Sequence, residues 1–249
     1  MTNIDVINAS SVLGDNDVAA IIPALQKQVS RDFAAAYGID AALDFVPRDG
    51  KPRAGSWWLS VLDDADAAGA LGYHDLTSEG LPLGKIFAGT DLKYGSSWTV
   101  TASHELLEML ADPTINLVVF TPDGKRLVAY EVADACEDDS LGYRVDGVLL
   151  SDFVTPAFFG VPGKVFDHCE HVTEPLQILP GGYLSMYDIR LGAGWHQVDG
   201  QALPAPKGRR PGAHLVKMMR RAHRTRPPVG SRRERRRTLR GHWLRSTAF

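Results

Sequence analysis

Alternating apolar and polar runs in the first part of the chain predict short strands and one long helix. Residues 4–7 have the composition of a strand. In residues 18–33, apolar side chains recur at steps of three and four residues, directly after the helix-capping run 15–17. We therefore expect a helix that ends near Tyr37, before Gly38, and that Pro23 could kink. Further strands are predicted at residues 42–46, 57–62 and 70–76, the last at a sheet edge, and a short apolar run follows at residues 85–88.

A second helix and a hairpin are predicted next. The helix begins near Ser97 and ends before Pro113. Residues 116–120 and 126–132 flank an Asp-Gly turn, which is a strong hairpin signal. Residues 143–206 hold short strand-like runs interrupted by Pro and Gly, with little helical periodicity. The pattern as a whole predicts an α+β fold.

Charge separates the end of the chain from the rest. Residues 207–249 contain 15 Lys and Arg and a single acid, so residues 1–206 contain 12 basic and 29 acidic residues and carry a net charge of −17. The basic tail is expected to be disordered. It could bind a polyanion by charge alone, fold back on the acidic body, or have no role.

Other bulk features are those of an ordinary globular protein. No run of about 18 apolar residues predicts a membrane span, and the N-terminus lacks the pattern of a secretory signal, so we expect a cytoplasmic protein without membrane contact. Two cysteines, Cys136 and Cys169, are too few for a disulfide scaffold. They could pair with each other, but two buried thiols are the simpler interpretation.

The helix near Ser97 carries the most specific chemistry in the sequence. His104 and Glu108 are four residues apart and therefore project from the same face of a helix, where they could hold one metal ion. Glu105 points to the adjacent side and could accept a proton from a water on that ion. The rest of the helix is strongly apolar, and a cation would compensate for the burial of these polar groups. A polar helix face without a metal is the alternative.

This pattern resembles the His-Glu-x-x-His helix of the zincin metallopeptidases, with Glu108 where the second His usually stands. The order of predicted elements over residues 3–137 is also similar to the N-terminal half of that family. The resemblance implies a mixed sheet with a long N-terminal helix and a metal-site helix in residues 1–137. The strand-like runs that follow predict a β-rich part of the same domain in residues 138–206. It also implies that Tyr73 and His74, on the edge strand, lie beside the substrate cleft.

The sequence does not identify the third metal ligand. A downstream acidic ligand in the zincins suggests Glu131 or Asp134, with the other supporting a ligand His. Glu131, Asp134 and Glu137 could instead form a solvated acidic turn. His168 and His171 are a weaker pair that could reach the cleft or belong to a surface loop. The expected cofactor is one divalent ion, with Zn²⁺ first and Mn²⁺, Fe²⁺ or Ca²⁺ admitted by the carboxylate at Glu108.

These residues predict a metal-dependent hydrolase, and specifically a peptidase acting on a peptide or protein substrate with Glu105 as the general base. The alternative from another class is a non-catalytic zincin-like binding or structural protein, for example one associated with a phage or other particle. A third alternative is polyanion binding through residues 207–249.

Overall fold

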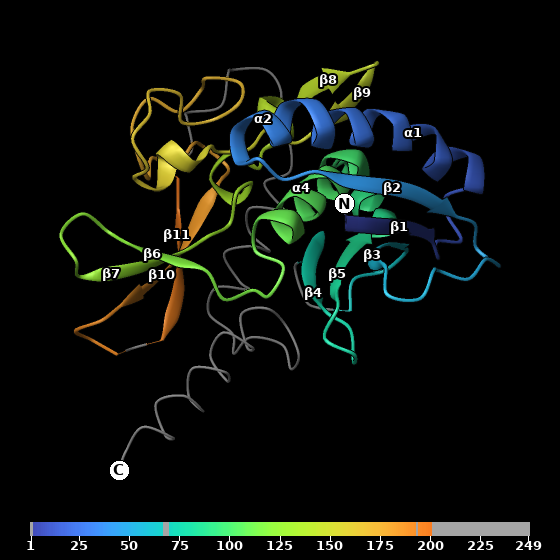
Figure 1. The fold of residues 1–249 in the computed structure, drawn as a ribbon, viewed down its shortest axis with the longest axis horizontal. Coiled ribbons are helices and arrows are strands. Elements are labelled where there is room, and N and C mark those ends of the chain that lie inside the picture. Colours follow the sequence, from blue (N-terminus) through green and yellow to red (C-terminus); the bar gives the residue numbers. More distant parts are fainter. Residues whose placement is uncertain (1, 67–69, 193, 201–249) are drawn as a thin grey trace, which may run out of the picture.

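The computed structural model describes residues 2–66, 70–192 and 194–200, and its fold is α+β (Figure 1). The basic tail at residues 207–249 lies outside the described residues. The larger sheet has five strands in the order β2-β1-β3-β5-β4. All neighbours in this sheet are parallel except β4, which runs antiparallel to β5 at the edge. The strands are β1 (Thr2–Asn8), β2 (Ala41–Val46), β3 (Trp57–Leu62), β4 (Gly72–Leu76) and β5 (Pro82–Phe87).

Helices pack against one face of this sheet. A long helical segment lies along β1 and β2, and α4 (Trp98–Ala111) packs against β3, β4 and β5. The long segment is made of α1 (Asp15–Lys27), the π-helical turn η1 (Gln28–Phe33) and α2 (Ala34–Tyr37). It ends where Gly38 adopts a left-handed conformation with φ 67°, as the sequence predicts. Its irregular part is η1, which begins five residues after Pro23.

The boundaries of two other elements differ from the sequence prediction. Strand β5 begins at Pro82, whereas the apolar run predicts a start at Lys85. Pro82 and Gly84 look like turn residues in the sequence, yet proline is tolerated as the first residue of a strand. The short helix α3 (Ala88–Tyr94) that follows β5 was not predicted. Strands β3 and β4 and helix α4 lie where the sequence places them, with β4 beginning two residues later.

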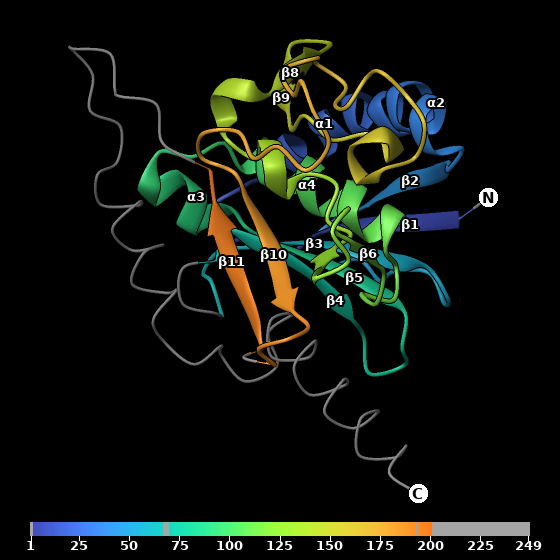
Figure 2. The ribbon, with the colours of Figure 1, turned by 90° about the vertical axis from the view of Figure 1, so that its left-hand side faces the viewer.

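A second sheet and several short elements complete the fold (Figure 2). Four antiparallel strands pair in the order β11-β10-β7-β6, and the Asp123-Gly124 turn joins β6 and β7 as predicted. The strands are β6 (Val118–Phe120), β7 (Arg126–Ala129), β10 (Tyr183–Asp188) and β11 (Trp195–Asp199). A hairpin and three 3₁₀ turns lie between β7 and β10: β8 (Tyr143–Val145), β9 (Val148–Leu150), η2 (Asp134–Cys136), η3 (Asp139–Leu141) and η4 (Pro156–Phe159).

One continuous hydrophobic core joins both sheets through α4. Its buried members include Val6 of β1, Leu106 and Leu107 of α4, Val128 of β7 and Met186 of β10. The residues after β7 therefore pack onto the same core as the five-stranded sheet. None of the helices in the described residues is long and apolar enough to cross a lipid bilayer.

Candidate metal centre

Helix α4 is buried on every side, and this makes its polar residues unusual. Every residue from Val100 to Ala111 is buried, including His104, Glu105 and Glu108. Burying an imidazole and two carboxylates carries a large desolvation cost unless opposite charges or hydrogen bonds compensate. The surroundings of these three side chains therefore decide what the helix can bind.

His104, Glu108 and Asp134 converge on one point. The Nε2 atom of His104 lies 3.4 Å from Oε1 of Glu108 and 3.3 Å from Oδ1 of Asp134. The potential ligand atoms of the three residues all lie within 4.8 Å of one another. Ligands at the usual zinc distance of about 2.0 Å in a tetrahedral site lie about 3.3 Å apart, which matches the two His104 distances.

Asp134, rather than Glu131, meets the two helix residues. Glu131 is also buried, but it belongs to none of the potential metal-ligating groups in the described part of the chain. The sequence does not distinguish Glu131 from Asp134 as the third metal ligand. What separates them is the turn η2, which carries Asp134 toward the middle of α4.

Three backbone contacts fix η2 in this position. The N–H of Ala133 donates to Oε1 of Glu108 over 3.4 Å, and the N–H of Leu179 donates to the carbonyl of Ala135 over 3.0 Å. Gly182 packs directly on the turn: a Cβ added there would lie 2.4 Å from the carbonyl oxygen of Ala135. Any larger residue would push η2 away, so the Gly182 turn sets the depth at which Asp134 sits.

The edge strand β4 contributes His74 from the other side. Its Nδ1 atom lies 3.4 Å from Oε2 of Glu108 and 3.7 Å from Oε2 of Glu105. The two oxygens of Glu108 thus face different imidazoles, Oε1 toward His104 and Oε2 toward His74. Tyr73 points away because side chains alternate along a strand; its hydroxyl contacts Asp66 and Lys85 instead, so the structure does not bring it to the site.

Two glycines let helix α4 pack closely on the sheet, and one of them makes room for Glu105. Gly72 of β4 lies against its side chain, and a Cβ there would be 2.9 Å from both Cγ and Oε1 of Glu105. Gly84 of β5 makes room for Leu59, whose Cδ1 atom would lie 2.6 Å from a Cβ there, whereas Glu105 would be in ordinary contact at 3.7 Å or more. Helix α4 can therefore pack closely on the sheet while keeping the Glu105 carboxylate beside His74.

The electrostatics of the cluster favour a bound positive charge. Burial disfavours the protonated imidazole of His104, but Glu108 and Asp134 outweigh this effect and raise its pKa well above the usual value. Glu137, half-buried after η2, has a pKa raised well above its usual range by burial, with Asp134 and Glu108 adding to the effect and His104 opposing it. A divalent cation would neutralise the negative charge of Glu108 and Asp134, which the protonated imidazole of His104 otherwise balances.

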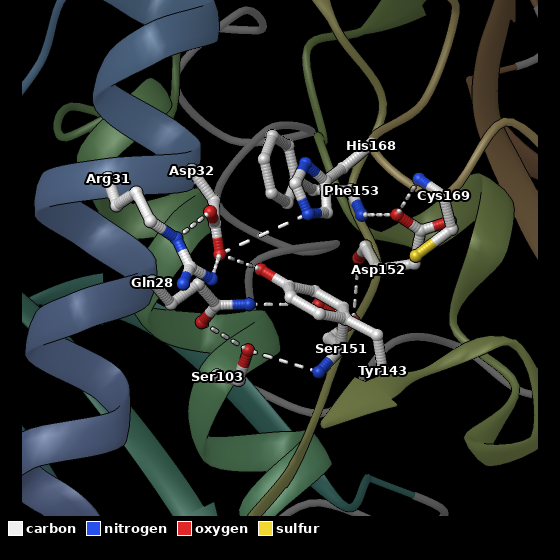
Figure 3. A network of polar contacts seen from close by, with 10 residues as sticks. All are labelled: Gln28, Arg31, Asp32, Ser103, Tyr143, Ser151, Asp152, Phe153, His168 and Cys169. Atoms are coloured by element: carbon white, nitrogen blue, oxygen red, sulfur yellow. Dashed lines mark hydrogen bonds and ion pairs between the residues drawn. The ribbon is translucent and has the colours of Figure 1, made fainter. Parts of the chain in front are cut away.

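The two histidines of the 168–171 segment lie away from this cluster. His168 stacks on Phe153, with ring centroids 5.1 Å apart, and burial lowers its pKa so that the neutral form is favoured (Figure 3). The Nδ1 atom of His171 lies 3.3 Å from Oδ2 of Asp152. Neither belongs to the groups around Glu108.

A polar network holds α4 against its neighbours one residue before His104. The Ser103 hydroxyl donates to Oε1 of Gln28 over 2.7 Å and accepts the N–H of Ser151 over 3.1 Å (Figure 3). Nε2 of Gln28 donates in turn to the carbonyl of Ser151 over 3.0 Å. Helix α4, the π turn η1 and the segment after β9 are thereby fixed relative to one another.

The cluster thus combines an imidazole and two carboxylates around one point, with Glu105 and His74 beside them. Such a donor set suits a divalent cation that accepts nitrogen and oxygen ligands. No family model matches the chain, and no match to it was found among the curated proteins or the solved structures.

Proposed function

We propose that the protein is a metal-dependent hydrolase in which His104, Glu108 and Asp134 bind one divalent cation. The convergence of these three side chains, from a helix and from a turn 26 residues later, is the observation that carries the proposal. The position of Glu105 next to the ligands supports a hydrolytic role. The antiparallel edge strand beside the metal helix supports the zincin resemblance and, with it, a peptide bond as the substrate.

Zn²⁺ is the first choice of ion, and Mn²⁺ is the second. Zinc binds imidazole and carboxylate ligands and takes three protein ligands in catalytic sites, which leaves one position for water or substrate. Two carboxylates in place of imidazoles make the site more oxygen-rich and shift its preference toward harder cations. Metal analysis of the purified chain distinguishes the two ions.

In the proposed reaction, the chain's own residues move one proton. The cation would polarise the substrate carbonyl and lower the pKa of a water molecule. Glu105 accepts a proton from that water while the water oxygen forms a bond to the carbonyl carbon. Glu105 then passes the proton to the amine nitrogen as the C–N bond breaks. His74, 3.7 Å from the Glu105 carboxylate, orients it.

A structural ion in a non-catalytic protein is the second candidate, and the burial of the site favours it. His104 is 8% exposed, Asp134 1% and Glu108 0%. A polypeptide substrate could reach these atoms only after the surrounding segments move apart. An ion that only braces α4 against η2 needs no such opening.

Metal analysis combined with a peptide-cleavage assay separates the two candidates. The full chain is stripped with a chelator, reloaded with Zn²⁺ or Mn²⁺ and incubated with a diverse peptide library, and products are read by mass spectrometry. The proposal predicts cleavage that disappears in Glu105→Gln while the metal content stays unchanged. Glu79→Gln, at an exposed position, is the matched control.

The other outcomes are equally informative. Stoichiometric metal without cleavage of any peptide would favour the structural ion. A chain that binds no divalent cation would contradict both candidates and leave a buried polar helix face.

A further inference from the structure

Besides the two overlapping groups that share Glu108, a separate group of potential metal-ligating side chains lies in the irregular segment between β9 and β10. Asp152, Cys169 and His171 each offer one ligand atom, and these atoms all lie within 4.8 Å of one another. Asp152 follows β9 directly, and the other two lie 17 and 19 residues further along the chain. None of them belongs to the cluster on α4.

Hydrogen bonds from backbone N–H groups hold the Asp152 side chain and the backbones of the other two residues in place. Oδ1 of Asp152 accepts the N–H groups of Phe153 over 2.8 Å and Cys169 over 3.2 Å, as Figure 3 shows. Its other oxygen, Oδ2, is directed toward His171, 3.3 Å from Nδ1. Asp167 accepts the N–H of His171 over 2.9 Å and so fixes the backbone of the third residue.

Charge at this place is unbalanced. Asp152 and Asp167 are both 0% exposed. Among the described residues, the ion pairs of both carboxylates are with His171. A cation coordinated by Asp152 and His171 would compensate for the burial of these two acidic side chains better than one partly exposed imidazole can.

The site is also open to solvent. The His171 side chain is 39% exposed, against 10% for His104 in the cluster on α4. An ion could therefore enter without any movement of the core. His171 can also adjust its position to bring its ring nitrogen into coordination distance.

We propose that Asp152, Cys169 and His171 form a second metal site that selects a zinc-class cation. Thiolate and imidazole ligands favour Zn²⁺ over Mg²⁺ or Ca²⁺, and one carboxylate is compatible with it. Tetrahedral zinc places such ligands about 3.3 to 3.5 Å apart, which the Asp152–His171 pair already meets. The Cys169 thiol releases its proton to solvent when the metal–sulfur bond forms.

The ion would fasten the irregular segment to the core. The residue pair Val154 and Asp167 already forms an isolated bridge across this segment, and the N–H of Val154 donates to the carbonyl of Val132 over 2.7 Å. An ion on Asp152, Cys169 and His171 would close the same loop next to this bridge, two residues further out on each side. This inference does not depend on the proposed hydrolase.

Cobalt spectroscopy on the full chain tests the site, because the cluster on α4 contains no thiol. Under reducing conditions, Co²⁺ added to the metal-free protein should give a thiolate-to-cobalt charge-transfer band in the near ultraviolet. The band should vanish in Cys169→Ser and persist in Cys136→Ser, which changes the other cysteine. It should also persist in Asp134→Asn, which removes a ligand of the first site only.

The exposed His171 gives a variant with little risk of misfolding. His171→Ala should weaken Co²⁺ binding, followed by the same band, by more than about tenfold, since even the loss of an outer partner of a metal ligand typically costs that much. Absence of the band at saturating Co²⁺, or a band that survives Cys169→Ser, would overturn the proposal. Far-ultraviolet circular dichroism on each variant confirms that the fold is retained.

Discussion

Gly182 sets how closely the start of β10 approaches the turn that carries Asp134, and an alanine there should loosen the metal site. A Cβ at this position would lie 2.4 Å from the carbonyl oxygen of Ala135 and 2.7 Å from that of Asp134. Both neighbours are backbone atoms, so no side-chain rotation can relieve the overlap. Reaching a separation of 3.0 Å requires a shift of η2 by at least about 0.6 Å.

Such a shift is large compared with what a metal site tolerates. Ligand distances in a working site vary by about 0.2 Å, so a displaced Asp134 would coordinate poorly or not at all. We expect Gly182→Ala to weaken Zn²⁺ binding by about tenfold to a hundredfold, or roughly 1.4 to 2.7 kcal/mol. Overpacking should also lower the free energy of unfolding of the metal-free protein by about 1 to 3 kcal/mol.

Competition with a chromophoric chelator, in chains that also carry Cys169→Ser to remove a ligand of the proposed second site, gives the affinity, and urea denaturation gives the stability. Gly14→Ala is the control, because a Cβ there meets only the Asp17 carboxylate, at 3.3 Å, and its backbone is extended with φ −74°. Wild-type zinc affinity in Gly182→Ala, with the expected loss of stability, would refute the link between η2 and the metal.

Three further predictions concern separate parts of the chain. Gly72→Ala should displace the Glu105 carboxylate and reduce cleavage at least tenfold while zinc content stays constant, as metal analysis and rate assays can check. Despite burial, hydrogen bonds from residues 10–12 lower the pKa of Asp63 to about 2, so its stabilisation is present above pH 4 and lost as the pH falls toward 2. Asp63→Asn should therefore cost about 1 kcal/mol in urea denaturation at pH 7, where solvent screening limits the effect, and almost nothing at pH 2. Removal of residues 207–249 should abolish salt-sensitive retention on a heparin column and leave metal binding unchanged.

The part of the site on α4 was predictable because it is local. His104, Glu105 and Glu108 follow from helical spacing alone, and the apolar residues between them fix the helix. The choice between Glu131 and Asp134 was not predictable, since it depends on the approach of Gly182 from about 50 residues downstream. Long-range packing of this kind leaves no periodic pattern in the sequence.

In the fold, too, local features were predictable from the sequence and long-range packing was not. The Gly38 helix end and the Asp123-Gly124 hairpin were predicted correctly because glycine is needed where the backbone is left-handed. The sequence predicts too short a strand β5 because Gly84 looks like a turn residue. In the fold, Gly84 makes room for Leu59, whose Cδ1 atom would lie 2.6 Å from a Cβ at position 84. The segment that carries Asp152 is held by side-chain-to-backbone hydrogen bonds, which hydrophobic periodicity does not reveal.

The identity of the third ligand tests the account most directly. Zinc affinity is measured by chelator competition in the full chain carrying Cys169→Ser, which removes a ligand of the proposed second site and serves as the wild-type reference. Asp134→Asn and Glu131→Gln are then added singly, so that one buried carboxylate changes in each variant. The account predicts that Asp134→Asn binds Zn²⁺ more than about tenfold more weakly, whereas Glu131→Gln stays near the wild-type affinity. Unchanged binding in Asp134→Asn, or a larger loss in Glu131→Gln, would contradict it.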